Sequence, residues 1–371
     1  MDSSARHSTG ALRSIAFYLP QYHPIAENDA WWEPGFTEWF NVVRARPKLR
    51  GQYQPHLPAD LGFYDLRVPE TRLQQAVMAR EYGLTAFCYF HYWFSGRQLL
   101  ERPFNEVLAS GEPSFPFLLC WANENWTRGW DTSRRALLVT QTYSEEDDLA
   151  HVRWLCNAFA DPRYLRVDGR PVFLVYRAEM LPDARRTAEL WRAEAQRLGV
   201  GDLYLVRVES HHEAPIDPAD LGFDAATEFH PDTRVLTSQA PRLLRGLKRL
   251  GQGPRRRKHR IHQYSNLVDR ALSQSQPDYR RYRCVVPSWD NSARRVDSAF
   301  ILTGSTPAKF GGWLEGVVER FTPYSPEENL VFVNAWNEWA EGNHLEPCQR
   351  YGRGYLEAHL AAIAGRGGTR P

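Results

Sequence analysis

The chain has 371 residues, 43% hydrophobic and 24% charged, which is the balance of a globular protein with a sizeable core. Its 46 Lys and Arg residues nearly match its 44 Asp and Glu residues, so we expect no nucleic-acid partner. Five scattered cysteines without a CxxC pair exclude a disulfide scaffold or a zinc finger. No secretory signal or apolar run of membrane-spanning length is visible, which predicts a cytoplasmic protein with reduced thiols.

Short apolar, β-rich segments alternate along the chain with longer stretches of helical periodicity. Strands are expected at residues 14–20, 84–93, 115–123, 171–177, 202–210, 225–231, 283–290 and 330–339. Helices are predicted at residues 70–82, 144–160 and 182–198, with Gly83 and Gly199 as the stop signals of the first and third. Eight such units predict an α/β fold, a single (β/α)8 (TIM) barrel with long, aromatic-rich βα loops. No GxGxxG or GxxxxGK[ST] string occurs, which argues against nucleotide-binding folds.

Four parts of the chain lie outside this alternation. Residues 1–13 are expected to be disordered and residues 365–371 to form a tail, so residues 14–364 make up the catalytic barrel. Residues 25–64 form a long aromatic loop after the first strand, a feature that usually has a function. The segment from Arg242 to Arg260 has nine Lys and Arg in 19 positions. We interpret it as a solvated basic insertion; the alternatives are an anionic partner and peripheral contact with a membrane or a lipid-linked glycan.

The active site of such a barrel lies at the C-terminal ends of the strands. All eight predicted strands end in polar and aromatic residues. The candidate substrate-binding residues there and in the first loop are Tyr18, Gln21, His23, Trp32, Glu38, His91, Trp93, Trp121, Asn123, Glu124, Trp126, Glu209, Glu228, Trp289, Asp290, Asn337 and His344. Aromatic faces cover sugar rings while carboxylates and amides bind hydroxyls, so this composition predicts a neutral polyhydroxylated ligand. The alternative is that the aromatic residues serve packing alone.

Glu338 and Glu341 are the candidate catalytic residues. On a continuing strand they would face opposite ways, but on a helical turn they would share a face, with Cβ atoms about 5–6 Å apart. Two carboxylates at about that distance suit retaining glycoside chemistry, with one protonated and one ionised. Their repulsion would raise one pKa, as an acid working near neutral pH requires. ExxE alone is more often structural, and it is the position on strand eight that favours catalysis.

A metal site is a weaker interpretation. Glu209, His211, His212 and Glu213 are ligand types, but they lack HExxH or helical i,i+4 spacing. No GxSxG nucleophile elbow is present either. We therefore expect neither a metal nor another cofactor.

Long tryptophan-rich strings connect the sequence to a known family. They are AFYLPQYHPIAENDAWWEPGFTEWFNVVRARP, QYQPHLPADLGFYDLR, HYWFSGRQLLE, FPFLLCWANENWTRGWD, VVPSWDNSARR and VNAWNEWAEGNHLEP. Over about residues 15–355 the chain resembles the WbsX-type proteins, which are described as glycoside hydrolase family 99-like and are found among bacterial polysaccharide genes. The resemblance implies a retaining, endo-acting (β/α)8 enzyme on mannose-type glycans. It also implies that Glu338 deprotonates the sugar 2-hydroxyl to form a 1,2-anhydro sugar, and that Glu341 protonates the leaving oxygen.

Two other functions stay open. WbsX-type proteins also carry a glycosyltransferase label, which would imply a nucleotide-sugar enzyme of O-antigen or capsule assembly. The charge for its diphosphate site could come from Arg128, Arg177, Arg294 and Arg295, although no DxD at a strand end is evident. The second alternative is a catalytically silent glycan-binding module in a biosynthetic complex. In each case the expected partner is an oligosaccharide or polysaccharide.

Overall fold

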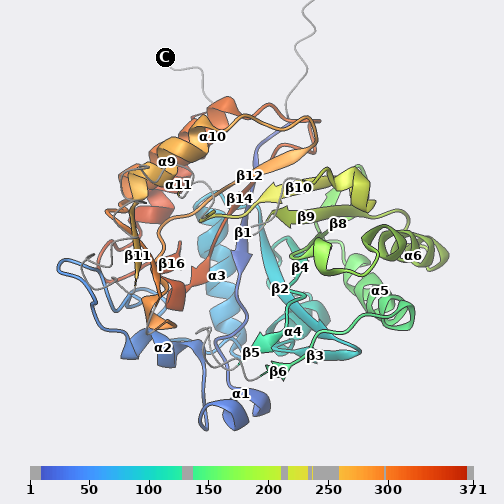
Figure 1. The fold of residues 1–371 in the computed structure, drawn as a ribbon, viewed down its shortest axis with the longest axis horizontal. Helices are drawn as coiled ribbons and strands as arrows, with labels where there is room; N and C mark the ends of the chain where they lie inside the picture. Colours follow the sequence, from blue (N-terminus) through green and yellow to red (C-terminus); the bar gives the residue numbers. More distant parts are fainter. Residues whose placement is uncertain are drawn as a thin grey trace, which may run out of the picture.

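The computed structural model describes residues 10–127, 137–209, 216–232, 236, 259–295 and 298–365. Eight parallel strands close into a barrel (Figure 1). In barrel order they are β1 (Arg13–Tyr18), β2 (Ala86–Phe94), β4 (Phe117–Trp121), β8 (Arg170–Val175), β9 (Tyr204–Glu209), β10 (Ala225–Glu228), β12 (Arg281–Val285) and β14 (Leu330–Val333). The barrel closes because β1 pairs in parallel with both β2 and β14. The predicted (β/α)8 barrel and its eight strands are confirmed.

Helices follow the strands and cover the outside of the barrel (Figure 1). They are α3 (Pro69–Glu81), α4 (Arg102–Ser110), α5 (Glu145–Phe159), α6 (Ala184–Arg197), α9 (Tyr264–Ser273), α10 (Pro307–Arg320) and α11 (Gly354–Ala364). After β9, the described chain has the 3-10 turn η2 (Pro218–Leu221) in this position. The three predicted helices are confirmed as α3, α5 and α6. Their signals act as expected, since the Ser144 hydroxyl accepts the Asp147 amide at the start of α5, and Gly83 and Gly199 adopt positive φ.

Short strands and helices lie in the loops between the barrel strands and the outer helices. Four strand pairs lie beside the barrel strands: β3 (Arg97–Leu99) on β2, β7 (Arg166–Val167) on β8, β5 (Trp126–Thr127) with β6 (Leu137–Val139), and β11 (Arg260–Gln263) with β13 (Phe300–Thr303). Residues 25–64 are not simply a loop, because they contain α1 (Ala26–Trp31) and α2 (Glu38–Arg44). These helices have six and seven residues, too few for a helical period to show in the sequence.

Alternation along the strands separates two apolar layers. Phe17 of β1 points into the barrel, where its ring lies 5.2–5.7 Å from Phe90, Phe229 and Phe332. The next residue, Tyr18, faces the helices, and its hydroxyl donates to Gln75 of α3 at 2.7 Å. Tyr18 therefore lies in the barrel wall, away from the position expected for a substrate-binding residue.

Several expectations concern the chain ends, the cysteines and the membrane. Residues 1–9, 242–258 and 366–371 lie outside the described residues, and so does most of the predicted N-terminal segment, of the tail and of the basic insertion. Arg13, the last residue of that N-terminal segment, already belongs to β1. The five cysteines are buried and unpaired, as expected. Within the described ranges, no helix is both long and apolar enough to cross a membrane.

Candidate active site

One guanidinium joins three carboxylates at the C-terminal end of the barrel. Arg294 places Nε 2.9 Å from Glu38 Oε2, Nη2 3.0 Å from Glu338 Oε2, and Nη1 3.0 Å from Glu341 Oε1. The side chains of Arg294, Glu38 and Glu338 are 5–8% exposed, whereas that of Glu341 is 16% exposed. Three buried carboxylates against one cation leave excess negative charge, which favours retention of a proton in the cluster.

A short turn brings the two predicted catalytic residues to one side. Glu338 ends β15 (Asn337–Glu338) and caps the 3-10 turn η4 (Trp339–Glu341), of which Glu341 is the last residue. Of the two arrangements considered for this pair, a continuing strand and a helical turn, the structure has the turn. Gly342 follows at φ +58°, where an added Cβ would lie 3.1 Å from the Asp290 carbonyl oxygen. Glycine is required because the Asp290 amide closes against this turn, donating to the Glu341 carbonyl at 2.6 Å.

The Asp290 side chain orders the turn that presents Arg294. The 3-10 turn η3 (Asn291–Ala293) ends at Arg294, and Asp290 Oδ1 accepts the Ser292 amide at 3.0 Å at its start. Gln52, from the loop after β1, donates to Asp290 Oδ2 at 2.6 Å. Loops after the first, seventh and eighth barrel strands therefore assemble the carboxylate cluster together.

Burial is the largest influence on the pKa of Glu338 and of Glu341. It raises the pKa of Glu338 to about 8, against the lowering effect of Arg294, and it also raises the pKa of Glu341. The pKa of Arg294 lies well above its usual value, because the three carboxylates outweigh the loss of solvent. Near neutral pH the pair therefore holds one proton, which the two coupled carboxyl groups share.

The wall behind the pair is fixed by buried polar groups. Asn337 accepts the Leu19 amide at 2.7 Å and donates to the Leu19 carbonyl at 3.0 Å, so this predicted substrate-binding residue ties strand eight to strand one. The Tyr22 hydroxyl donates to the Asn337 carbonyl at 2.6 Å and accepts the Trp339 amide at 3.1 Å. Burial raises the pKa of Tyr22, so its hydroxyl stays protonated in this role.

Glu346 is a further buried carboxylate, outside the cluster, that contacts the turn with Glu338 and Glu341. Glu346 accepts hydrogen bonds from Tyr64 at 2.8 Å, Gln75 at 2.7 Å and the Trp339 indole at 2.6 Å. Burial raises the pKa of Glu346 to about 7. Through the indole, Glu346 holds the ring of a residue in the catalytic turn itself.

Four further predicted residues surround the cluster. The Gln21 carbonyl accepts the Glu38 amide at 3.3 Å, and its side chain donates to the Tyr92 hydroxyl at 3.1 Å. Trp126 contacts the ring of Tyr92 edge-on, with centroids 5.1 Å apart. His344, on β16 (Asn343–His344), stacks on Trp339 at 3.7 Å, and Asp290 holds the Arg294 turn. Gln21, Asp290 and His344 therefore contact the carboxylate cluster or the turn that carries Glu338 and Glu341, and Trp126 packs one residue further out, on Tyr92.

Other aromatic candidates are turned away from the site. His91 contacts the ring nitrogen of His151 in α5 at 3.0 Å, the Trp93 indole donates to Asp147 at 2.9 Å, and the Trp121 indole donates to the Trp93 carbonyl at 3.1 Å. These side chains pack between the barrel and α5, and a role for them in substrate binding stays a prediction. The run LTAFCYFHYW is apolar on both strand faces, and its composition does not tell which face is inner.

The acidic candidates of strands five and six join a separate ion-pair cluster. Glu209 accepts the Tyr279 hydroxyl at 2.5 Å and lies 3.6 Å from Arg281. Glu228 lies 3.1 Å from Arg283, and despite burial its pKa falls to about 2 beside His230 and the arginines. These two carboxylates are paired with side chains of the barrel wall, and their role in substrate binding stays a prediction.

The remaining candidates occupy varied positions. Asn123 joins strand ends through the Arg177 amide and carbonyl, at 2.8 and 2.9 Å, and Glu124 pairs with the Arg177 guanidinium at 2.6 Å. His23 is buried, which lowers its pKa to about 4. Trp32 is 41% exposed and stacks on Phe36. Within the described part of the chain, none of these four predicted side chains bonds to a carboxylate of the cluster.

The structure also bears on two alternatives from the sequence. Of the arginines considered for a diphosphate site, Arg177 and Arg294 are engaged by carboxylates, and Arg128 lies outside the described residues. The metal alternative rests on His211, His212 and Glu213, which also lie outside them. Within the described ranges, no group of three or more His, Cys, Asp or Glu residues could hold a metal ion.

Sequence reasoning missed the residues that organise the pair. Arg294 was considered only as a source of charge for a diphosphate, and Tyr22, Gln52 and Glu346 were not singled out. A usable signal existed for Arg294, because a buried carboxylate pair needs a cation and the string SWDNSARR follows strand seven. Nothing comparable marks Glu346, whose partners come from distant segments.

Fold and site together define a (β/α)8-barrel protein with a carboxylate cluster at the C-terminal face of the barrel. The family model described as "Glycosyltransferase WbsX" matches residues 14–359, and the chain belongs to this family. "Uncharacterized protein WxcX" proteins from two Xanthomonas campestris pv. campestris strains, B100 and ATCC 33913, are each 43% identical over 350 residues. The match covers 94% of the chain and 49% of each relative, so the chain spans about half their length.

Solved structures share the fold at low sequence identity. A GH99 endo-alpha-mannosidase from Bacteroides thetaiotaomicron matches with a TM-score of 0.57 and 12% identity, over 95% of this chain and 97% of that one. A chain described as a glycoside hydrolase-like protein matches with a TM-score of 0.54 and 14% identity, over 95% and 94%. These likenesses support the barrel fold.

Proposed function

We propose that the protein is a carbohydrate-active enzyme that cleaves a glycosidic bond with retention of configuration, using Glu338 and Glu341. The observation that carries the proposal is the Arg294-bridged carboxylate pair on strand eight, with a raised pKa on each member. A shared proton gives the pair one acid and one base near neutral pH. In line with the family resemblance, the substrate is a mannose-type glycan of a bacterial surface polysaccharide or its precursor.

The first step forms a 1,2-anhydro sugar. Glu338 takes the proton of the sugar 2-hydroxyl, and that oxygen attacks the anomeric carbon as the bond to the leaving oxygen breaks. Glu341 donates its proton to the leaving oxygen. A sugar hydroxyl is a weak acid, so a base whose own pKa is raised by burial suits the task.

The second step opens the anhydro ring. Glu341 takes a proton from water, and the water oxygen attacks the anomeric carbon. The bond between that carbon and the oxygen of the former 2-hydroxyl breaks, and this oxygen recovers its proton from Glu338. Glu341 has to face both the leaving group and the incoming water. Its greater exposure, 16% against 8% for the Glu338 side chain, supports this division of roles.

Glycosyl transfer is the second candidate, because the family model carries a glycosyltransferase description. A nucleotide-sugar donor needs cations for its diphosphate. The engagement of Arg177 and Arg294 by carboxylates favours hydrolysis over this alternative.

Mass spectrometry of wild type and Glu341→Gln tests the proposal. Each protein is incubated with one pool of α-mannosides and bacterial surface glycans and another of nucleotide sugars with acceptors. Fragments that gain one water only with wild type support hydrolysis and the role of Glu341, whose loss should cost at least about 10²-fold. Free nucleotide with a lengthened acceptor, or full activity of Glu341→Gln, contradicts the proposal.

A further inference from the structure

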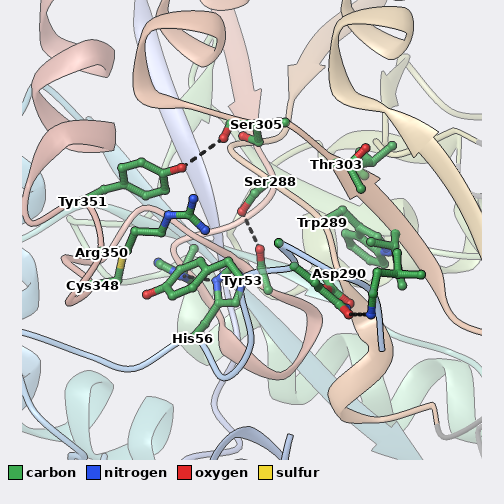
Figure 2. Close-up of a pocket in the computed structure, with 18 of the residues that line it drawn as sticks. Tyr53, His56, Ser288, Trp289, Asp290, Thr303, Ser305, Cys348, Arg350 and Tyr351 are labelled. Atoms are coloured by element: carbon green, nitrogen blue, oxygen red, sulfur yellow. Dashed lines mark hydrogen bonds between the residues drawn. The ribbon is translucent and has the colours of Figure 1, made fainter. Parts of the chain in front are cut away.

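A cavity of about 230 Å³ lies beside the catalytic turn (Figure 2). Its walls come from residues 49–56, 288–290, 301–305 and 342–355, which include the predicted residues Trp289, Asp290 and His344. Asp290 and Gly342 line the cavity and also contact the turn that carries the glutamate pair, since Gly342 ends that turn and the Asp290 amide donates to the Glu341 carbonyl. The cavity therefore adjoins the proposed site on the far side of one backbone turn.

The lining combines aromatic faces with hydroxyl groups. The rings are those of Tyr53, Trp289, Tyr351 and Tyr355, and the hydroxyls include those of Ser288, Thr303 and Ser305. Such a lining suits a sugar, because flat apolar faces cover the ring while the hydroxyl oxygens accept hydrogen bonds from it. The three hydroxyls act as acceptors, because their own protons go to the carbonyls of Gly342, His262 and Pro287. The volume lies below the roughly 300–1,000 Å³ of drug-sized sites, which limits the occupant to about one sugar unit.

The cavity has an available positive charge. The Arg350 guanidinium lies between two tyrosine rings (Figure 2), 4.9 Å from the centre of Tyr53 and 5.2 Å from that of Tyr351. Among the described residues no carboxylate pairs with it, in contrast to Arg353, which binds Asp60 at 2.7 Å. Ring stacking holds a guanidinium in place and leaves its edge open for a planar anion.

The other charged groups of the lining do not neutralise Arg350. Asp290 is the one carboxylate of the described lining, and Gln52 and the Ser292 amide already bind its two oxygens. Burial lowers the pKa of His56 and lowers that of His344 to about 4, so both rings are neutral at pH 7. A second cation, Arg50, also lines the cavity, which leaves the lining positively charged.

We propose that this cavity is a subsite for an acidic sugar unit, which bears a carboxylate or a phosphate ester that Arg350 binds. The inference rests on the proposed function, because it assumes that the occupant belongs to a glycan substrate. The sequence predicts a neutral polyhydroxylated ligand, whereas this proposal adds one acidic sugar unit close to the cleaved bond. A bidentate arginine contact would make the enzyme select for that charge.

The test is direct binding to the full chain, measured by calorimetry with methyl glucuronoside, glucose 6-phosphate, methyl glucoside and inorganic phosphate. We expect at least one sugar anion to bind at least tenfold more tightly than methyl glucoside or inorganic phosphate. The tighter of the two anions identifies carboxylate or phosphate as the source. Arg350→Gln should lose at least tenfold in this affinity, whereas the matched control Arg353→Gln should keep it.

Three results would overturn the subsite: equal affinity for neutral and anionic sugars, unchanged affinity in Arg350→Gln, or no binding of either sugar anion. A fourth result, an affinity for inorganic phosphate equal to that for glucose 6-phosphate, would also overturn the subsite, because the sugar would then contribute nothing to binding. The measurement needs no turnover and is repeated with Glu341→Gln, which should bind normally. Absence of hydrolysis with intact Arg350-dependent binding would thus contradict the proposed function and not the subsite.

Discussion

Replacement of Arg294 by glutamine tests whether one cation sets the charge of the whole cluster. Its guanidinium lies 2.9–3.0 Å from one oxygen of each of three carboxylates. Opposite unit charges with centres roughly 4 Å apart attract by about 4 kcal/mol at an effective dielectric constant of about 20. Loss of this attraction should raise the pKa of Glu338 and that of Glu341 by about 3 units. In Arg294→Gln the pair should therefore stay protonated above pH 8, where the wild type ionises.

An infrared titration of the protonated carboxyl band follows this change without a substrate. The wild type should lose part of the band near pH 8, and Arg294→Gln should retain it to higher pH. The matched control is Arg186→Gln, which breaks an ion pair with Glu145 whose members are 50% and 62% exposed. This surface pair should leave the titration unchanged. A variant at position 294 that still titrates near pH 8 would refute the assignment of Arg294 as the organising cation.

Further predictions concern pH and the turn. If the singly protonated pair is the active form, kcat/KM for glycan cleavage should fall as pH rises through about 8, and a pH-rate profile flat across that range would contradict the assignment. Glu346 has a raised pKa, so the native state holds an extra proton between pH 4.5 and 7 and loses stability as pH rises through this window. Between pH 4.5 and 7, the unfolding free energy of the wild type, measured with urea, should fall by up to about 3 kcal/mol relative to that of Glu346→Gln. A difference between the two proteins that does not change with pH would refute the raised pKa of Glu346. Gly342→Ala should lower the unfolding free energy by about 1–3 kcal/mol, because the added Cβ would press against Asp290. The control is Gly35→Ala, since Gly35 also has a positive φ but no neighbour within 4 Å, and this variant should lose less. Equal losses in the two variants would show that the contact with Asp290 has no effect.

The barrel was predictable because its signals are local. Each strand is a short apolar run, and three of the helices have a cap or stop such as Ser144 or Gly199, so these segments are recognisable by themselves. The ExxE turn was predictable for the same reason, since its two members lie three residues apart. These inferences needed no knowledge of which residues meet across the fold.

The candidate site was predictable only in part, because its other members come from distant segments. Glu38 and Arg294 are 256 positions apart, yet they lie in direct contact. The strand-end aromatics show a second limit, because the sequence does not reveal that the rings of His91 and Trp93 pack against α5. A strand that is apolar on both faces gives no sequence period from which to tell its inner side.

The proposed chemistry also connects the hydrolase fold with the glycosyltransferase description of the family. In a route through a 1,2-anhydro sugar, Glu341 activates whichever hydroxyl reaches the anomeric carbon in the second step. Water gives hydrolysis, whereas a sugar hydroxyl held in the same place gives transfer with the same retained configuration. Because the pair is only 8–16% exposed, access for water is already narrow, and a bound acceptor could compete with it. In such a site the choice between hydrolysis and transfer depends on the surrounding loops rather than on the glutamate pair.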